Sequence, residues 1–233
     1  MSDVPHVPLD AIARRALEYV TAGAVVGLGT GHAATAFIEE LAMRMRKGLR
    51  VRGIPTSQAS AELAIKLGIP LTTLEQTAAI DVDVDGADEV DPDGNLIKGY
   101  GGALVRERIV AASAKRFVIL VGNEKLVDRL GSHGKLPVEV VPFALPLCQR
   151  SLASLGYESQ VRLKSGERQL TDNGNHILDC RIPRLDDPAA VDAAIRAIPG
   201  VVGTGLFLNM RPTIVIQHPG EIEIRENGHA SGG

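Results

Sequence analysis

Carboxylates are concentrated in one short segment of the sequence, residues 79–95, which reads AIDVDVDGADEVDPDGN. Its seven acidic residues are Asp81, Asp83, Asp85, Asp88, Glu89, Asp91 and Asp93. Carboxylates packed this densely repel one another, so metal ions, other cations or water must offset their charge. The segment could therefore bind calcium or perform acid–base chemistry, and a solvated acidic turn is the third interpretation.

The spacing of the acidic residues tests the calcium interpretation. The opening of an EF-hand loop is matched by Asp81, Asp83, Asp85 and Gly86. Such a loop needs a bidentate Glu at its twelfth position, where this chain has Pro92. The valines that alternate with the acidic residues are typical of a strand, whereas an EF-hand loop is flanked by amphipathic helices. We therefore expect no metal site here.

Two strand-to-helix turns are rich in small and hydroxyl residues. Residues 27–32 (GLGTGH) can present backbone N–H groups to an anion, aided by the N-terminus of the following helix. They match neither a P-loop nor a complete dinucleotide fingerprint, so a small phosphate and a tight turn without a ligand both remain possible. In residues 53–60 (GIPTSQAS), helix capping alone could explain Ser57, or both turns could share one phosphorylated ligand.

Residues 98–107 (KGYGGALVRE) form a more unusual segment. The glycines around Tyr100 let the backbone approach a ligand closely, and a helix is predicted to start just after them. Glu107 would lie about one turn into that helix, as a catalytic carboxylate or as a solvated side chain between two arginines. Lys125 follows a predicted strand and could hold a phosphate or be an ordinary surface lysine.

Helices and strands alternate through the first half of the chain, which indicates parallel βαβ units. The predicted helices span residues 9–22, 32–47, 57–67 and 103–114, and the predicted strands 24–29, 51–54, 80–84 and 116–121. This pattern predicts a doubly wound, mainly parallel, Rossmann-like α/β sheet. Ligands bind such sheets at the carboxyl ends of the strands, where the glycine turn and the acidic segment both fall.

After about residue 131 the pattern changes to strands interrupted by helices. Strands are predicted over 136–141, 160–163, 169–171 and 176–182, and helices over 145–155 and 187–198. Residues 201–208 and 213–224 either close this unit or return to the main sheet. We therefore predict an α/β catalytic domain of residues 1–131 plus 206–233. A smaller α+β domain of residues 132–205 would supply oligomer contacts or a lid.

The composition excludes several classes of protein. The formal charge of −3 and an aromatic content of 3% without tryptophan do not favour nucleic-acid binding. Cys148 and Cys180 lie far apart, as expected of reduced, buried thiols. No signal peptide and no membrane-spanning apolar run is evident. We expect a cytoplasmic protein with no nucleic-acid or membrane partner.

Taken together, the motifs of the chain resemble ribose-5-phosphate isomerase of the A type. The resemblance rests on residues 26–31 (VGLGTG), 85–91 (DGADEVD), 98–107 (KGYGGALVRE), 136–143 (LPVEVVPF), 171–175 (TDNGN) and 200–202 (GVV). It implies an aldose–ketose isomerase that interconverts ribose 5-phosphate and ribulose 5-phosphate through an enediolate, without metal or cofactor. It also implies a homodimer or homotetramer. A sugar-phosphate-binding or regulatory homologue without turnover, or an isomerase of shifted sugar-phosphate preference, is the alternative.

The resemblance also implies roles for individual residues. Glu107 would be the base that moves the proton between C1 and C2. Asp85 and Asp88 would assist ring opening and hydroxyl proton transfers, and Lys98 would stabilise developing negative charge. The residues expected to bind substrate are Gly29, Thr30, Gly31, His32, Ala33, Gly86, Ala87, Gly99, Tyr100, Gly101 and Lys125.

The chain departs from the family pattern around ligand recognition. His32 and Ala33 follow Gly31 where the family usually has Ser-Thr, and Asp10 stands about where the family has a lysine. Gly122 and Glu124 replace an Asp and a Ser, and Tyr100 replaces the second residue of the glycine run. These changes put the phosphate contacts in question more than the chemistry. One hypothesis is that His32 replaces the lost hydroxyls as a phosphate donor.

Overall fold

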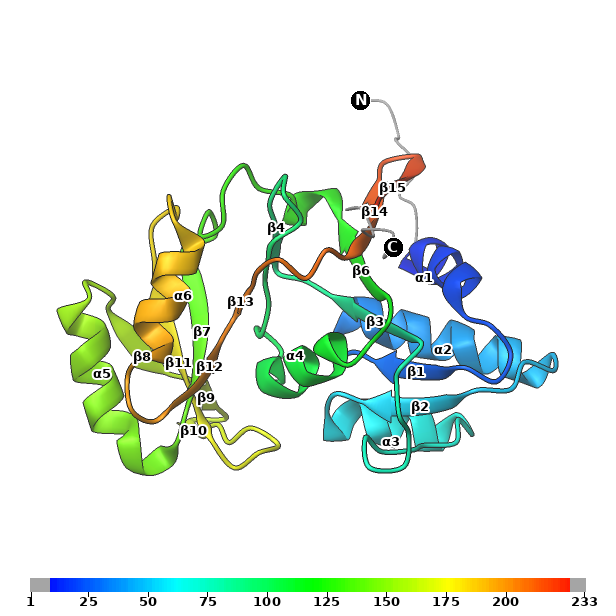
Figure 1. Ribbon diagram of the computed structural model, residues 1–233, viewed down its shortest axis with the longest axis horizontal. Coiled ribbons are helices and arrows are strands. Elements are labelled where there is room, and N and C mark those ends of the chain that lie inside the picture. The colour runs from blue at the N-terminus through cyan, green and yellow to red at the C-terminus, as the bar shows by residue number, and fades with distance from the viewer. Residues whose placement is uncertain (1–8, 227–233) are drawn as a thin grey trace. The chain divides into compact units, whose positions relative to one another are not determined.

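The structure, a computed structural model, describes residues 9–226. Packing divides them into two compact units, which are described separately (Figure 1). Unit 1 comprises the described parts of Met1–Ala87, Arg106–Lys125 and Met210–Gly233. Unit 2 comprises Asp88–Val105 and Leu126–Asn209. Packing thus groups residues 88–105, 126–131 and 206–209 with the smaller unit, although the sequence patterns placed them in the catalytic domain. The predicted roles of the two domains stay predictions.

Unit 1 is built on a six-stranded sheet with the order β15-β14-β6-β3-β1-β2. Its strands are β1 (Val25–Leu28), β2 (Arg52–Pro55), β3 (Val82–Gly86), β6 (Phe117–Gly122), β14 (Thr213–His218) and β15 (Glu221–Glu226). All neighbours pair in parallel except β14 and β15, which are antiparallel. The predicted mainly parallel α/β sheet is therefore confirmed.

Helices cover both faces of this sheet. They are α1 (Leu9–Ala16), α2 (His32–Arg46), α3 (Gln58–Lys66) and α4 (Leu104–Ala112), with the short 3-10 helices η1 (Leu17–Tyr19) and η2 (Asn123–Lys125). Helices α1 and α2 pack in one apolar cluster with Val82 and Val84 of β3. Val110 of α4 packs in another cluster with Val25 and Ile80. Because side chains alternate along a strand, Asp83 and Asp85 point away from the first cluster, toward the face that carries α4.

Unit 2 contains a four-stranded antiparallel sheet with the order β12-β7-β11-β8. These strands are β7 (Lys135–Val140), β8 (Ser159–Val161), β11 (His176–Arg181) and β12 (Val201–Thr204). Two smaller sheets contain β4 (Glu89–Val90), β5 (Leu96–Ile97) and β13 (Leu206–Phe207), and β9 (Leu163–Lys164) and β10 (Glu167–Arg168). Its helices are η3 (Pro142–Ala144), α5 (Leu145–Ser154) and α6 (Pro188–Arg196).

The two faces of the four-stranded sheet differ in character. Alternate residues of β7 and β11, such as Val138, Leu178 and Cys180, pack with α5 and α6 in one apolar cluster. The intervening residues, which include Glu139 and Asp179, therefore lie on the opposite face. Cys148 and Cys180 are buried free thiols, as expected from the sequence.

Three segments differ from the predictions made from sequence. The helix predicted over 9–22 ends at Ala16 and continues as η1, because Val20 is already extended with ψ 115°. The strand predicted over 169–171 is reduced to a single antiparallel bridge between Leu170 and His176. It ends there because the Thr171 side chain accepts hydrogen bonds from the amides of Asn173 and Asn175 and forms a turn. Residues 213–224 are a hairpin rather than one strand, since Gly220 turns the chain with φ +87°.

The acidic segment also contains more regular structure than expected. Strand β3 extends through Asp85 and Gly86, because both residues pair with β6. Beyond it, the Asp91 carboxylate accepts hydrogen bonds from the amides of Asp93 and Asn95. This turn brings β5 against β4, so the stretch predicted to be a loop is a short hairpin.

Candidate active site

The order of strands in unit 1 marks the place where a ligand is expected. Strand β1 lies between β2 and β3. The chain therefore adds β2 on one side of β1 and then crosses over to add β3 on the other side. Open α/β sheets bind ligands at the carboxyl ends of the strands at such a switch point. Here these ends carry the turn of residues 29–33 after β1 and Asp85 in β3.

Asp85 is completely buried and held by the backbone of this turn. Its Oδ1 atom accepts hydrogen bonds from the amide of Thr30 (3.0 Å) and from the amide of Gly86 (2.8 Å). The close approach needs glycine at position 29, because a Cβ atom there would lie 2.3 Å from Asp85 Oδ1. A buried carboxylate with two backbone donors is fixed in both position and orientation.

Four hydroxyl side chains, Thr30, Thr56, Ser57 and Ser60, form a hydroxyl cluster behind the turn. The Thr30 hydroxyl lies 2.8 Å from the hydroxyls of both Thr56 and Ser57. The Ser60 hydroxyl donates to the carbonyl of Gly29 at 2.6 Å. The Ser57 side chain also accepts a hydrogen bond from the amide of Ser60 and caps α3, which one of the two interpretations of this turn predicted. The second hydroxyl-rich turn therefore supports the first one.

Glu107 is not the solvated side chain that its arginine neighbours could suggest. It is 3% exposed and lies in the first turn of α4. Val110, three residues further on, packs against the sheet, and residues three apart share one helix face. Glu107 therefore faces the sheet side toward which Asp83 and Asp85 point. Unit 1 thus gathers two of the predicted catalytic carboxylates on one face of its sheet.

The remaining predicted residues of unit 1 are placed as follows. Gly31 precedes α2 with φ +104°, and His32, the first residue of α2, is exposed. Ala33 packs against the α1–α2 cluster, and Gly86 and Ala87 follow Asp85. Lys125 ends η2, which follows β6 directly.

A cavity of about 290 Å³ opens at the carboxyl ends of β6 and β14. Its walls are formed by Leu9, Gly122, Asn123, Glu124, Gln217, His218 and Pro219. Two residues of this wall, Gly122 and Glu124, are among the departures from the family pattern noted in the sequence.

The other predicted residues belong to unit 2. Lys98 is 2% exposed, and its Nζ atom lies 5.6 Å from the centre of the Phe207 ring. Asp88 is half-buried, and its Oδ2 atom accepts a hydrogen bond from the amide of Tyr100 at 2.9 Å. Gly99 has φ +105°, and Gly101 is exposed. The structure therefore joins Asp88 directly to the glycine segment.

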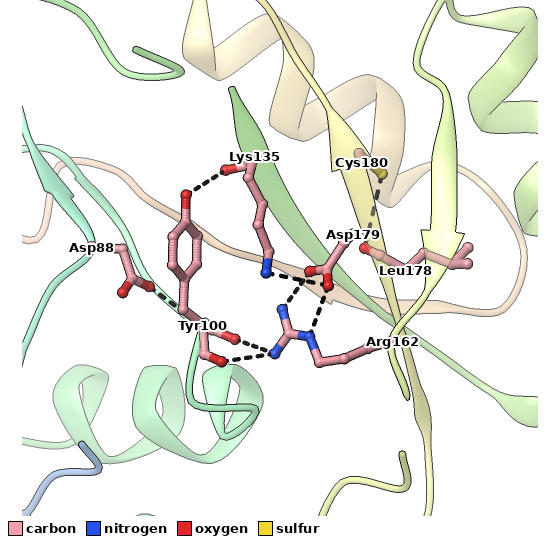
Figure 2. Close-up of polar contacts among 8 residues, drawn as sticks. Asp88, Tyr100, Lys135, Arg162, Leu178, Asp179 and Cys180 are labelled. Atoms are coloured by element: carbon pink, nitrogen blue, oxygen red, sulfur yellow. Dashed lines mark hydrogen bonds and ion pairs between the residues drawn. The ribbon is translucent and has the colours of Figure 1, made fainter. Parts of the chain in front are cut away.

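Sequence reasoning missed the side chains that hold this segment. Figure 2 shows Arg162 donating to the carbonyls of Gly99 (2.8 Å) and Tyr100 (3.1 Å), and pairing with Asp179. Lys135 contacts both Asp179 and the Tyr100 ring. No spacing in the sequence connects these positions, because they meet only once the four-stranded sheet has formed.

Tyr100 is buried enough to alter its titration. Burial, followed by the nearby Asp88 carboxylate, raises the pKa of its phenol above the ordinary value. The phenol donates a hydrogen bond to the carbonyl of Lys135 at 3.3 Å.

The other acidic residues of the segment 79–95 have separate partners. Asp81 pairs with Lys115 at 2.8 Å, and this hydrogen bond lowers the pKa of the Asp81 carboxyl. The buried Glu89 accepts from the amides of Gly131 and His133, both at 2.6 Å. Among residues 9–226, no group of three His, Cys, Asp or Glu side chains is arranged to hold a metal ion. Nor does any helix in this range have the length and apolarity needed to span a membrane.

Comparison with known proteins identifies the family. A family model described as ribose 5-phosphate isomerase A (phosphoriboisomerase A) matches residues 52–221. Ribose-5-phosphate isomerase A of Roseiflexus castenholzii is 53% identical over 217 residues, which cover 92% of this chain and 93% of that protein.

Solved structures agree with this assignment. Ribose 5-phosphate isomerase A from Methanocaldococcus jannaschii has a TM-score of 0.89 and 39% identity, over 94% of this chain and 97% of that one. A D-ribose-5-phosphate isomerase in complex with phospho-erythronic acid has a TM-score of 0.90 and 37% identity over the same shares. The chain therefore belongs to the ribose 5-phosphate isomerase A family.

Proposed function

We propose that the protein interconverts D-ribose 5-phosphate and D-ribulose 5-phosphate by metal-independent proton transfer through an enediolate. The family relationship over more than nine-tenths of the chain supports the reaction. The observation that carries the mechanism is that Asp85 and Glu107, both buried, lie on one face of the unit 1 sheet.

In this proposal Glu107 removes a proton from C2 of the open-chain aldose and returns it to C1. A single carboxylate can serve both steps if water is kept away from it, and burial of Glu107 meets that condition. Its place in the first turn of α4 adds a second favourable feature, because negative charge is stabilised near a helix N-terminus.

Asp85 and Asp88 assist ring opening and the transfer of hydroxyl protons. Both carboxylates accept backbone amide hydrogen bonds, which fix the direction in which each can exchange a proton. Lys98, almost completely buried, supplies positive charge for the enediolate oxygens, where a cation in a low-dielectric site has most effect.

The phosphate is proposed to contact the turn of residues 29–33 and Lys125. The turn offers backbone amides at the N-terminus of the fifteen-residue helix α2, and His32 is its first residue. A phosphorylated sugar acid, such as the ligand in the related complex, fits this proposal, because its carboxylate carries charge where an enediolate would.

The decisive experiment measures turnover of ribose 5-phosphate in chelator beside the variant Glu107→Gln. We expect the parent to remain active and the variant to lose about 100-fold or more of kcat, because an amide cannot accept the proton. His32→Ala in the same assay should raise KM, because the variant lacks the ring N–H that is proposed to donate to the phosphate.

Two outcomes would overturn parts of this proposal. A parent protein that binds the sugar phosphate without turnover would be a binding homologue instead. An unchanged KM in His32→Ala would remove His32 from the phosphate contacts. The cytoplasmic location and the homodimer or homotetramer are also proposals, and light scattering separates the two assemblies by mass.

A further inference from the structure

The glycine segment of unit 2, residues 99–102, rests against a charged side chain that no sequence motif identified. Nη1 of Arg162 donates to two successive carbonyls of this segment, those of Gly99 (2.8 Å) and Tyr100 (3.1 Å). Gly102 continues the close packing, since a Cβ atom there would lie 3.0 Å from Gln169 Nε2 and 3.9 Å from Arg162 Nη1. One guanidinium group therefore orients the backbone of the segment.

Arg162 is itself fixed by Asp179. Its Nε atom donates to Asp179 Oδ2 at 2.9 Å, and its Nη2 atom donates to Asp179 Oδ1. The Arg162 side chain is 9% exposed and that of Asp179 is 21% exposed. A partly buried bidentate pair holds the guanidinium plane in one orientation, which a single contact could not do.

The Gly99–Tyr100 peptide group connects Arg162 to Asp88. Its carbonyl oxygen, that of Gly99, accepts from Arg162, and its N–H, that of Tyr100, donates to Asp88 Oδ2 at 2.9 Å. Hydrogen bonds on both sides of one peptide polarise it in the same direction and strengthen each other. The series Asp179–Arg162–peptide–Asp88 is drawn in Figure 2.

Tyr100 adds a second attachment for the same peptide. Its ring lies 4.6 Å from Nζ of Lys135, and its hydroxyl donates to the carbonyl of Lys135. Lys135 in turn pairs with Asp179 at 3.3 Å. The side chain of Tyr100 therefore contacts Lys135, which pairs with the same Asp179 that orients Arg162.

We propose that Arg162, oriented by Asp179, is a positioning residue for the isomerase, which sets the Gly99–Tyr100 peptide and through it the Asp88 carboxylate. This inference rests on the proposed function and adds a role for two residues outside the predicted site. Arg162 need not touch the substrate. Its loss should let the peptide rotate, so that Asp88 loses the hydrogen bond from the Tyr100 amide while the chain stays folded.

The test compares Arg162→Ala, Arg162→Lys and Asp179→Asn with the matched control Arg168→Ala, an exposed arginine on β10. Loss of a charge-assisted hydrogen bond predicts that Arg162→Ala lowers kcat about 10- to 100-fold per folded molecule. Arg162→Lys should recover part of this loss, and guanidinium ion at millimolar concentration should raise the activity of Arg162→Ala but not of the parent. Asp179→Asn should show a smaller loss, and the control none.

A second measurement does not depend on turnover. Hydrogen exchange at the Tyr100 amide should be faster in Arg162→Ala, while the β7–β11 ladder keeps the parent's rates. Equal acceleration in that ladder, or no recovery with lysine and guanidinium, would show that Arg162 merely stabilises the unit. If the parent has no turnover, the proposed function fails, and the exchange at Tyr100 alone decides the role of Arg162.

Discussion

Asp85 in unit 1 and Asp88 in unit 2 are three residues apart in sequence and are held in different ways. Asp85 is completely buried in a parallel strand, and two backbone amides supported by neutral hydroxyls fix it. Asp88 is half-buried, and the amide that it accepts belongs to a glycine segment held by a guanidinium group. The comparison teaches that two carboxylates with related proposed roles can be held by sheet packing in one case and by an ion pair in the other.

The largest effect on activity and stability is expected when a side chain at position 29 intrudes on the space that Asp85 occupies. In Gly29→Ala the new Cβ atom would meet Asp85 Oδ1 at 2.3 Å and its Cα atom at 2.7 Å. Because backbone must move, we expect about 100-fold lower kcat and a loss of about 1–3 kcal/mol in unfolding free energy. Kinetics and urea unfolding measure the two quantities.

Gly86→Ala is the folding control for this variant. A Cβ atom at position 86 has no neighbour nearer than 3.7 Å, so the free energy of unfolding should change little. If Gly29→Ala were as stable and as active as the parent, Asp85 would not be fixed by the turn.

A smaller effect is expected from the hydroxyl cluster. Ser60→Ala removes the 2.6 Å hydrogen bond to the Gly29 carbonyl and leaves that buried acceptor short of a donor. We expect unfolding free energy to fall by about 1–3 kcal/mol. Turnover should fall by less than about tenfold, because the amide of Thr30 still reaches Asp85.

Ser154→Ala on α5 is the matched control, since that hydroxyl donates only to the carbonyl of Arg150 within its own helix. Thermal unfolding and kcat of both variants should be compared with those of the parent. If Ser60→Ala matched this control in both measurements, the cluster would not support the turn.

The smallest effect is expected at Asp81, whose exposed carboxylate lies just before β3. Its lowered pKa means that the Lys115 pair stabilises the protein above the unfolded pKa, and that this contribution is lost as the pH falls through the folded pKa. Asp81→Asn should therefore lower unfolding free energy at pH 7 by about 0.2–1 kcal/mol. The difference from the parent should shrink toward pH 3 in urea unfolding, and a difference independent of pH would contradict this account.

Sequence patterns predicted most of unit 1 because its elements depend on local signals. The apolar run before Gly29, the glycine turn and the Ser57 cap each indicate a strand end or a helix start without distant partners. The acidic hairpin of β4 and β5 escaped prediction, because its strands are two residues long.

The candidate site was predicted less completely, for a related reason. The burial of Glu107 could not be read from a helix turn that also contains two arginines, since it depends on which face packs on the sheet. Arg162 and Asp179 are 17 residues apart and meet only across antiparallel strands. No local pattern encodes that pairing, so only the folded structure could show it.

The anchoring of Asp85 by main-chain groups bears on how this family can diversify. An amide N–H is present whatever side chain follows it, so the donors from Thr30 and Gly86 do not depend on the residues at positions 32 and 33. Those two positions can therefore mutate, as in the His32-Ala33 pair of this chain, while the carboxylate beside them keeps its geometry. In the proposed mechanism, substrate recognition at these two positions and the acid–base role of Asp85 are thereby free to evolve separately.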